Sequence, residues 1–429
     1  MPQSDTKSPL RIAIVGAGPR SVVYAREALQ RPDAMQVVAV ADPNEVRRNA
    51  LADAHGVPAQ HRFASHEDLA ARPGLADAAI NTTLDIAHYA TTLPLLRAGY
   101  HVLLEKPIAQ TEAEVRDLIR VAGEHRRIIM VCHILRYEPF YQTIKQLLAA
   151  GAIGRLMSIE TAENVSYDHV VTTFVRHPRN LQPTLPMLLS KCCHDLDVLA
   201  WLAGGTRLAR VASFIRPGQF RPENAPPGST QRCLDGCAVE STCRYSARAM
   251  HVEDDKWDAY AWPANEYPSM PSAEEKLRIL KMTSPYGRCA WRAPNQVVDH
   301  QSVLIEFADG VTATHDLFCA TTRPNRSIRI LGAAGEIEGD YTSGQIVLRR
   351  AIRGRTGRYE EEHTHVAPND AKAPSPRACE RALLADFIGT VRGDPAAPGI
   401  TRIEDSLVGH QIAFAADIAA RENRVVTAT

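Results

Sequence analysis

The first third of the chain alternates short apolar segments with amphipathic ones, at the spacing of strands and helices that follow each other in turn. A helix is expected to begin near Thr111, because Thr111 and Glu114 form a capping-box pattern ahead of Val115 and Leu118. Such alternation is typical of a parallel sheet that helices cover on both faces. The apolar runs predict five strands, at 12–15, 37–41, 78–81, 101–105 and 128–132.

Beyond residue 154 the pattern changes, and four segments alternate polar with apolar residues or are rich in β-branched ones. They predict a second domain built on a largely antiparallel sheet. Residues 220–295 have little periodicity and many prolines, cysteines and aromatic residues, which indicates a long irregular insertion. Helical spacing returns over 377–422, so we expect that segment to pack back across one of the domains. The four strand-like segments are 155–160, 301–307, 311–317 and 327–331.

The first predicted strand leads directly into a Gly-Ala-Gly turn and then into a predicted helix. Gly16 permits the tight turn, and Gly18 has no side chain to block a pyrophosphate. The N–H groups at the start of the helix, beside Pro19 and Arg20, attract an anion. Ser21 stands where the usual fingerprint has its third glycine, and it is small enough to keep helix and strand close. The turn therefore predicts dinucleotide binding.

The second predicted strand ends in Asp42, 26 residues after Gly16, which is close to the place of a ribose-binding carboxylate. A carboxylate there hydrogen-bonds the two ribose hydroxyls and repels a 2′-phosphate. NAD is therefore favoured over NADP, although Arg47 and Arg48 lie nearby in the sequence and keep NADP open.

The composition excludes several classes of partner. The 429 residues carry 49 basic and 49 acidic side chains, and these charges are interspersed. Electrostatic capture of nucleic acid or of an anionic membrane is therefore not expected. No apolar run is long enough to span a bilayer, and the first ten residues hold no signal-peptide core. We expect a cytoplasmic protein whose nine cysteines are reduced or bind metal.

Three further segments give the sequence a family resemblance: HVLLEKPIA at 101–109, HILRYEP at 133–139 and MLLSKCCHDLDVLAWLAGG at 187–205. These segments follow the nucleotide-binding fingerprint in the sequence, and the whole combination resembles the Gfo/Idh/MocA family over nearly the whole chain. The resemblance implies an α/β protein with an N-terminal Rossmann domain and a C-terminal α+β domain with a large, mostly antiparallel, open-faced sheet. It also implies a homodimer or homotetramer that associates through the exposed face of that sheet.

The expected boundaries follow from these patterns. A polar lead at 1–10 precedes a Rossmann domain at 11–135. A substrate and oligomerisation domain follows at 136–376 and contains the insertion at 220–295, and a C-terminal helical return covers 377–429.

Glu105, Lys106 and Pro107 close a predicted parallel strand at its carboxyl end, where open α/β sheets bind ligands. A lysine there can donate a hydrogen bond to the reacting oxygen and help to move the proton that accompanies hydride transfer. The resemblance gives Lys106 that catalytic role and places Glu105 and Lys106 beside the cofactor. The alternative is a surface lysine that pairs with Glu105.

The segment around His194 departs from the common family pattern, because Ser190 stands where many family dehydrogenases have an aspartate. His194 can still act as a general base, since imidazole titrates near neutrality. Lys191 can hold a substrate oxygen. Asp195 and Asp197 follow on the same predicted helix, and either one can fix the histidine tautomer or simply solubilise the helix.

The resemblance assigns other residues to the walls of the site. For Arg136 and Tyr137 a salt bridge and a packed ring are an equal alternative. The nicotinamide side is assigned Asn81, Thr82, Thr83 and His88, and the substrate side Arg136, Tyr137, Tyr167, His169, Arg176 and Asp195.

Four cysteines of the predicted insertion form a candidate structural zinc site, because four thiolates can close a tetrahedral site. Free buried thiols or an oxidised pair are the alternatives. The four are Cys233, Cys237, Cys243 and Cys289.

The resulting hypothesis is an NAD-dependent oxidoreductase that acts on a hydroxyl carbon of a small sugar, glycoside or cyclitol. One alternative is an NAD-dependent enzyme that cleaves glycosides through transient oxidation at C3 and elimination. The other is a non-catalytic regulatory protein that binds NAD or a sugar on the same fold.

Overall fold

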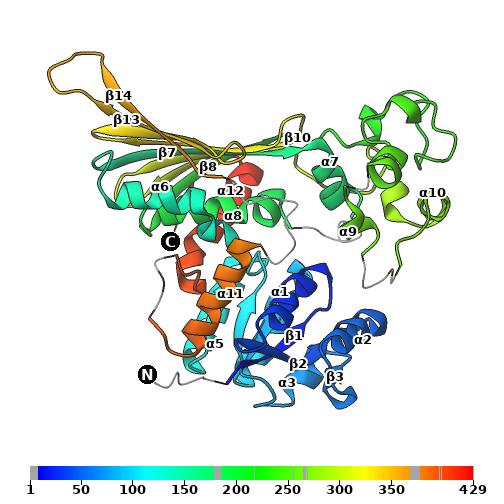
Figure 1. The fold of residues 1–429 in the computed structure, drawn as a ribbon. Helices are drawn as coiled ribbons and strands as arrows, with labels where there is room; N and C mark the ends of the chain where they lie inside the picture. The colour runs from blue at the N-terminus through cyan, green and yellow to red at the C-terminus, as the bar shows by residue number, and fades with distance from the viewer. Residues whose placement is uncertain are drawn as a thin grey trace. The chain divides into compact units, whose positions relative to one another are not determined.

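The computed structural model describes residues 8–177, 185–216, 218–254, 256–263, 267, 269–367, 377–395, 397 and 399–428. The chain divides into two compact units (Figure 1). Unit 1 joins Met1–Gln142 to Asn369–His410, and unit 2 joins Thr143–Pro368 to Gln411–Thr429. The tail that was expected to form a separate helical return is thus shared between the two units.

Unit 1 is built on a six-stranded parallel sheet with the order β3-β2-β1-β4-β5-β6. The five predicted strands are confirmed, and the two-residue strand β3 was not predicted. Thr111 forms the expected capping box with Glu114 at the start of α5. The strands are β1 (Leu10–Val15), β2 (Met35–Ala41), β3 (Arg62–Phe63), β4 (Ala78–Asn81), β5 (His101–Leu104) and β6 (Ile129–Val131). The helices between them are α1 (Pro19–Gln30), α2 (Glu45–Ala54), α3 (His66–Ala70), α4 (His88–Arg97) and α5 (Glu112–Glu124).

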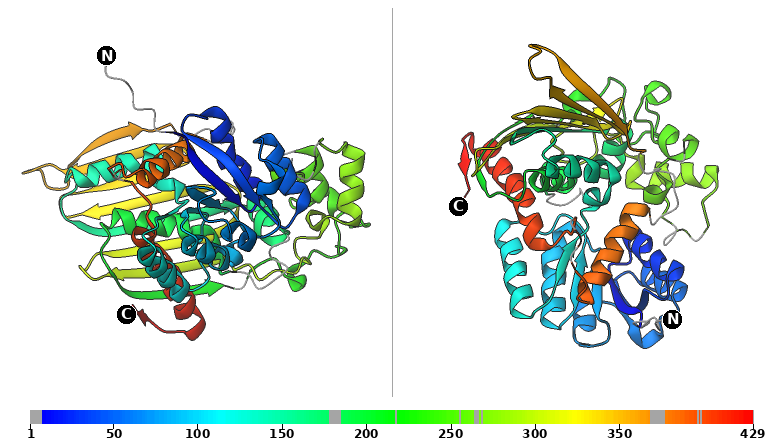
Figure 2. Two further views of the ribbon diagram at one scale, coloured as in Figure 1. Left: turned by 90° about the horizontal axis from the view of Figure 1, so that it is seen from below. Right: turned by 60° about the vertical axis from the view of Figure 1, so that its left-hand side comes forward.

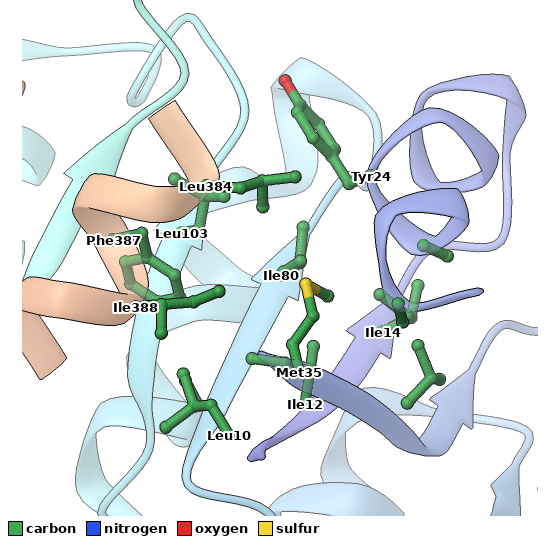
Figure 3. Packing of buried hydrophobic residues seen from close by; sticks show 14 of the residues in the cluster. Leu10, Ile12, Ile14, Tyr24, Met35, Ile80, Leu103, Leu384, Phe387 and Ile388 are labelled. Carbon is green, nitrogen blue, oxygen red and sulfur yellow. The ribbon is translucent and has the colours of Figure 1, made fainter. Parts of the chain in front are cut away.

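The core of unit 1 lies between this sheet and helices from both ends of the sequence (Figure 3). Ile12 and Ile14 of β1 point into it, since alternate residues of a strand share a face. The C-terminal helix α11 (Ala378–Val391) adds Leu384 and Phe387 to the same cluster. Burial of each such side chain contributes about 1.5–3 kcal/mol. The C-terminal return therefore completes the core of the nucleotide-binding unit.

Unit 2 is built on a nine-stranded sheet with the order β14-β13-β12-β11-β7-β10-β9-β8-β15, whose strands lie side by side in Figure 2. Every pairing is antiparallel except that of β7 with β10, so the predicted, largely antiparallel sheet is confirmed. The strands are β7 (Leu156–Ser166), β8 (Leu208–Arg216), β9 (His300–Phe307), β10 (Thr312–Thr321), β11 (Asn325–Gly332), β12 (Gly335–Asp340), β13 (Gln345–Ala351), β14 (Tyr359–His365) and β15 (Val426–Thr427).

Helix α8 (Met187–Leu202) packs against β7 and β10 on one face of this sheet. Val303 and Ile305 of β9 are buried, whereas Leu304 between them is exposed on the opposite face. Phe214 of β8 and Phe318 of β10 are exposed as well. The sheet therefore has one covered face and one face with exposed apolar side chains.

The insertion between β8 and β9 contains no strand in the part of it that the structure describes. Its longest helix is α10 (Ala273–Met282), and α9 (Asp258–Ala261) is a single turn. The remaining α-helices of the described chain are α6 (Pro139–Ala149), α7 (Tyr167–Val170) and α12 (Ile403–Glu422). None of the helices within the described ranges is long and apolar enough to cross a membrane.

Candidate functional site

The glycine turn of unit 1 has the geometry that a dinucleotide needs. Gly16 has φ +85°, and a Cβ there would lie 2.8 Å from the Thr83 amide nitrogen, so only glycine fits. The Thr82 hydroxyl donates to the Gly16 carbonyl at 2.7 Å and holds the two loops together. A Cβ on Gly18 would instead meet nothing within 4 Å, so the turn is open on that side. Ser21 is buried and donates to the Gly18 carbonyl at 2.6 Å.

Gly18 is also the N-cap of α1, where no side chain caps the helix. Pro19 occupies the first turn, which suits its fixed φ. The open turn and the uncapped helix start together can bind an anion such as a pyrophosphate. The residues present therefore fit a nicotinamide dinucleotide.

Asp42 lies beside this turn at the end of β2 and is 7% exposed. Its Oδ2 accepts from the Ala17 amide at 2.6 Å, and its Oδ1 accepts from the Asn44 amide at 2.7 Å. The Arg48 guanidinium donates to the Asp42 backbone carbonyl rather than to the carboxylate. The carboxylate is thus fixed next to the turn, where it suits a ribose diol.

A buried ion cluster holds Glu105 at the carboxyl end of β5. Its Oε1 accepts from Arg20 Nε and from the Tyr24 hydroxyl, each at 2.8 Å, and its Oε2 accepts from the Lys106 amide at 3.0 Å. Arg20 also donates to Glu380 of α11 at 2.9 Å. Burial alone would raise the pKa of Glu105, but Arg20 and Lys106 lower it to about 2. The cluster therefore links α1, the end of β5 and α11.

Arg20 and Glu105 thus form an ion pair with each other. A direct contact of either residue with the cofactor stays a prediction. Tyr24 and Glu380 were not found from the sequence. Arg20 and Tyr24 are four residues apart on one helix, and this spacing is a signal that could have found Tyr24. No local signal could have found Glu380, because it is 360 residues away from Arg20.

The backbone after Lys106 is held from two sides. The Lys106–Pro107 bond is cis. The buried His88 ring places Nδ1 2.6 Å from the Pro107 carbonyl and Nε2 3.1 Å from the Thr83 carbonyl. The Ile108 amide donates to His410 Nε2 at 3.0 Å. The Lys106 side chain is half-buried on this fixed turn.

Asn81 lies fully buried at the end of β4. Its amide nitrogen donates to Thr91 at 2.8 Å and to Thr92 at 2.9 Å, and its oxygen accepts from the Thr83 amide at 3.2 Å. Asn81 and His88 therefore shape the loop that carries Thr83. Their contact with a nicotinamide stays a prediction.

In unit 2, His194 is half-buried on α8 beside a cluster of four charged side chains. Lys191 Nζ lies 3.2 Å from Glu163 Oε1. Arg326 Nε lies 2.6 Å from Glu163 Oε2 and 2.7 Å from Asp195 Oδ1. Burial raises the pKa of Glu163, against the influence of Arg326 and Lys191. The sequence had singled out Lys191 and Asp195 but neither of their strand partners.

Tyr167 and His169, predicted to face substrate, are half-buried against residues of the insertion. The Arg244 guanidinium lies 5.3 Å from the Tyr167 ring centre, and the His169 ring lies 5.1 Å from that of Trp257. Their substrate role stays a prediction, and the insertion residues that cover them were not found from the sequence.

Arg136 and Tyr137 are buried within unit 1. Arg136 donates to the carbonyls of Ile400 at 3.3 Å and Asp405 at 3.1 Å, and Tyr137 packs in the core shown in part in Figure 3. Both side chains thus make contacts that support the fold, and a substrate contact stays a prediction.

Arg176 is 1% exposed and lies among the cysteines of the insertion. It donates to the Tyr245 carbonyl at 2.6 Å and the Arg288 carbonyl at 2.7 Å, and its Nη2 lies 3.4 Å from Cys233 Sγ. The substrate role expected of Arg176 stays a prediction, since these contacts hold the insertion.

The expected zinc site is not supported. Cys233, Cys237, Cys243 and Cys289 line one small cavity together with Arg176. Among the described residues, no group of three or more His, Cys, Asp or Glu side chains is placed to hold a metal ion. Burial raises the pKa of the Cys243 and Cys289 thiols, and the Arg176 cation occupies the space beside Cys233.

Comparison with known proteins identifies the nucleotide-binding part. Residues 10–133 match the oxidoreductase family GFO_IDH_MocA, described as having an NAD-binding Rossmann fold. Inositol 2-dehydrogenase 1 of Saccharopolyspora erythraea is 29% identical over 194 residues, which cover 45% of this chain and 54% of that protein. The trans-1,2-dihydrobenzene-1,2-diol dehydrogenase of Bos taurus is 32% identical over 210 residues, 48% of this chain and 60% of the relative. The chain thus spans about half the length of the curated relatives it matches.

Solved structures extend the likeness of fold to nearly the whole chain. An oxidoreductase from Agrobacterium radiobacter in complex with NAD⁺, L-tartaric acid and magnesium has a TM-score of 0.68 at 15% identity, over 98% of both chains. A UDP-N-acetylglucosamine 3-dehydrogenase from Acidithiobacillus ferrooxidans has a TM-score of 0.63 at 16% identity, over 97% of this chain and 99% of that one. At these identities the likeness extends to the fold alone.

Proposed function

We propose that the chain, which matches the Gfo/Idh/MocA family of oxidoreductases over residues 10–133, transfers hydride between NAD and a hydroxyl-bearing carbon of a sugar, glycoside or cyclitol. The turn at Lys106 carries this proposal. Glu105, Pro107 and Ile108 are held by side chains from three other elements, so Lys106 is presented at the carboxyl end of a parallel strand.

Lys106 is assigned the hydrogen bond to the reacting oxygen. An ammonium there stabilises negative charge on that oxygen as the C–H bond breaks or forms. His194 of unit 2 is assigned the proton transfer, in which it acts as general base during oxidation and as general acid during reduction. The cofactor supplies the hydride acceptor when it is bound.

NAD is the proposed cofactor, with NADP as the weaker alternative. The fixed Asp42 carboxylate would accept hydrogen bonds from a ribose diol and repel a 2′-phosphate. The Arg48 side chain, one of the two candidate partners for a 2′-phosphate, donates to the Asp42 carbonyl.

The proposed substrate is a small neutral polyol, in keeping with the zero net charge of the chain and with relatives named for inositol and a dihydrodiol. A cytoplasmic homodimer or homotetramer is proposed as well. The exposed apolar side chains Phe214, Leu304 and Phe318 on the open sheet face support association.

The test is a substrate screen on the purified chain. The nucleotide released on denaturation is identified, and the native protein is then given NAD with sugars, cyclitols and aryl glycosides while the absorbance of NADH is followed. Stoichiometric NADH formation supports a dehydrogenase. Aglycone release without net NADH supports the glycoside-cleaving alternative. If neither NADH formation nor aglycone release is seen, a binding protein becomes the better account.

A further inference from the structure

Four charged side chains meet where helix α8 packs on the sheet of unit 2. Glu163 of β7 and Arg326 of β11 are paired residues of neighbouring strands, and they contact Lys191 and Asp195 on the helix. The exposed fractions of the side chains are 6% for Glu163 and Asp195, 12% for Lys191 and 18% for Arg326. The cluster holds two carboxylates and two cations, so it is electrically balanced.

Stability alone does not account for this cluster. Removing four charges from water is costly, and well-packed apolar side chains would hold a helix on a sheet at least as firmly. Apolar side chains occupy other positions on this face, such as Ile159 of β7 and Ile328 of β11. What directed ion pairs add to such a contact is a single preferred alignment of the helix.

That alignment determines where His194 points. At 3.6 residues per turn, Lys191 and Asp195 lie about 40° apart around the helix axis, and His194 lies about 60° from Lys191. Two contacts so close in angle set the rotation of α8 about its axis. The direction of the His194 ring then follows from that rotation.

We infer that Glu163 and Arg326 are positioning residues for His194, which act by holding Lys191 and Asp195 and so fixing the rotation of α8. The inference rests on the proposed function only for the proton-transfer role of His194. His315 of β10 also faces this region, where its Nδ1 lies 2.9 Å from Thr161 Oγ1. Burial lowers the pKa of His315 and so favours its neutral ring. The charge of this region therefore comes from the four side chains of the cluster.

The test follows His194 itself, in full-length protein in which histidine is labelled with nitrogen-15. The ring signal is assigned by its loss in His194→Gln. Glu163→Gln removes the partner of Lys191, and Arg326→Lys keeps the charge but loses the contact of one Nε with both carboxylates. Arg349→Gln is the matched control, because it breaks ion pairs with Glu338 and Glu361 on the hairpin strands of the same sheet.

We expect Glu163→Gln and Arg326→Lys to shift the His194 ring signals and their titration in proteins that remain folded, with melting temperatures below that of Arg349→Gln because a buried charge loses its partner. On a substrate from the screen, kcat should fall by about tenfold to hundredfold in both variants with little change in NAD affinity. The inference is overturned if the His194 signals in both variants coincide with those of the wild type. It is also overturned if Arg349→Gln moves them equally. A shifted His194 in an enzyme without hydride transfer would support the positioning role and refute the proposed function.

Discussion

Lys106 combines a fixed backbone with a side chain that is only half-buried. The Lys106 amide donates to the Glu105 carboxylate. The His88 ring holds the Pro107 carbonyl, and His410 Nε2 accepts from the Ile108 amide. A fixed backbone limits the region that the Lys106 ammonium group can reach and so helps to place it beside a substrate oxygen. The proposed role therefore depends on one ammonium group that has no substitute on the same turn.

Replacing Lys106 tests that role at a single atom. Lys106→Ala should lower kcat/KM by about 10²–10⁴-fold, because the reacting oxygen loses its hydrogen-bond donor in the transition state. NAD affinity, measured by fluorescence titration, should change little. Lys281→Ala, at an exposed position of α10, is the control and should retain full activity. Wild-type turnover in Lys106→Ala would remove Lys106 from the chemistry.

Asp42 is the residue on which the proposed preference for NAD over NADP depends. Asp42→Ala should lower the ratio of kcat/KM with NAD to that with NADP by about tenfold, because it removes the repulsion of a 2′-phosphate, which is about 1 kcal/mol or more for like charges about 4 Å apart. Steady-state kinetics with both cofactors measure the ratio. An unchanged ratio would mean that the carboxylate serves only the Ala17 and Asn44 amides.

At the level of elements, Arg20 links α1, the end of β5 and α11 through two carboxylates. The pKa of Glu105 is about 2 in the folded chain and has an ordinary value of 4.5. The unfolded chain therefore takes up a proton first as the pH falls. This stabilisation is complete above about pH 5 and is lost progressively as the pH falls toward 2.

Glu105→Gln should lower the free energy of unfolding by about 3 kcal/mol at neutral pH. This difference in the free energy of unfolding should be complete above about pH 5 and should have fallen to about half by about pH 3. Urea unfolding at several pH values measures it. Glu112→Gln removes an exposed pair with Arg116 on α5 and should cost less than about 1 kcal/mol at any pH. A pH-independent loss in Glu105→Gln would contradict the account.

The insertion holds a second acid-sensitive group. His251 is fully buried, and among the described residues neither ring nitrogen has a hydrogen-bond partner. Burial, with Arg176 and Lys276 nearby, lowers its pKa from 6.5 to about 3. The unfolded chain therefore gains a proton before the folded one, and stability falls as the pH drops from 6.5 toward 3.

His251→Gln should reduce this loss, which amounts to about 1.4 kcal/mol per pH unit in that range. Tryptophan fluorescence can follow it, because three of the four tryptophans, at 257, 262 and 291, lie in the insertion. His363→Gln, with an exposed ring on β14, is the control and should leave the pH dependence unchanged. Equal pH profiles for His251→Gln and the wild type would refute the assignment.

Local patterns predicted the elements of unit 1 and the start of α5, because strand runs, the glycine turn and a capping box are encoded in neighbouring residues. They did not predict β12, β13 and β14, which carry many charged residues that pair between neighbouring strands, as Arg349 does with Glu361. For the same reason, Glu380 and Glu163 escaped notice, since each gains its role from residues distant in sequence. A cysteine pattern predicted a metal site, but the position of Arg176 among those thiols is a tertiary feature.

At the scale of the whole molecule, the two units carry different parts of the proposed chemistry. Unit 1 holds the glycine turn, Asp42 and Lys106, and unit 2 holds His194 with its charge cluster.

The central claim is that a substrate carbon passes hydride to the nicotinamide, and isotopic labelling tests it most directly. A substrate from the screen is deuterated at the reacting carbon and incubated with NAD and the enzyme, and the mass of the nicotinamide cofactor is measured. The account predicts one deuterium in the cofactor with the wild type and a strongly reduced rate of transfer with Lys106→Ala, whereas product formation with no deuterium in the cofactor would contradict it.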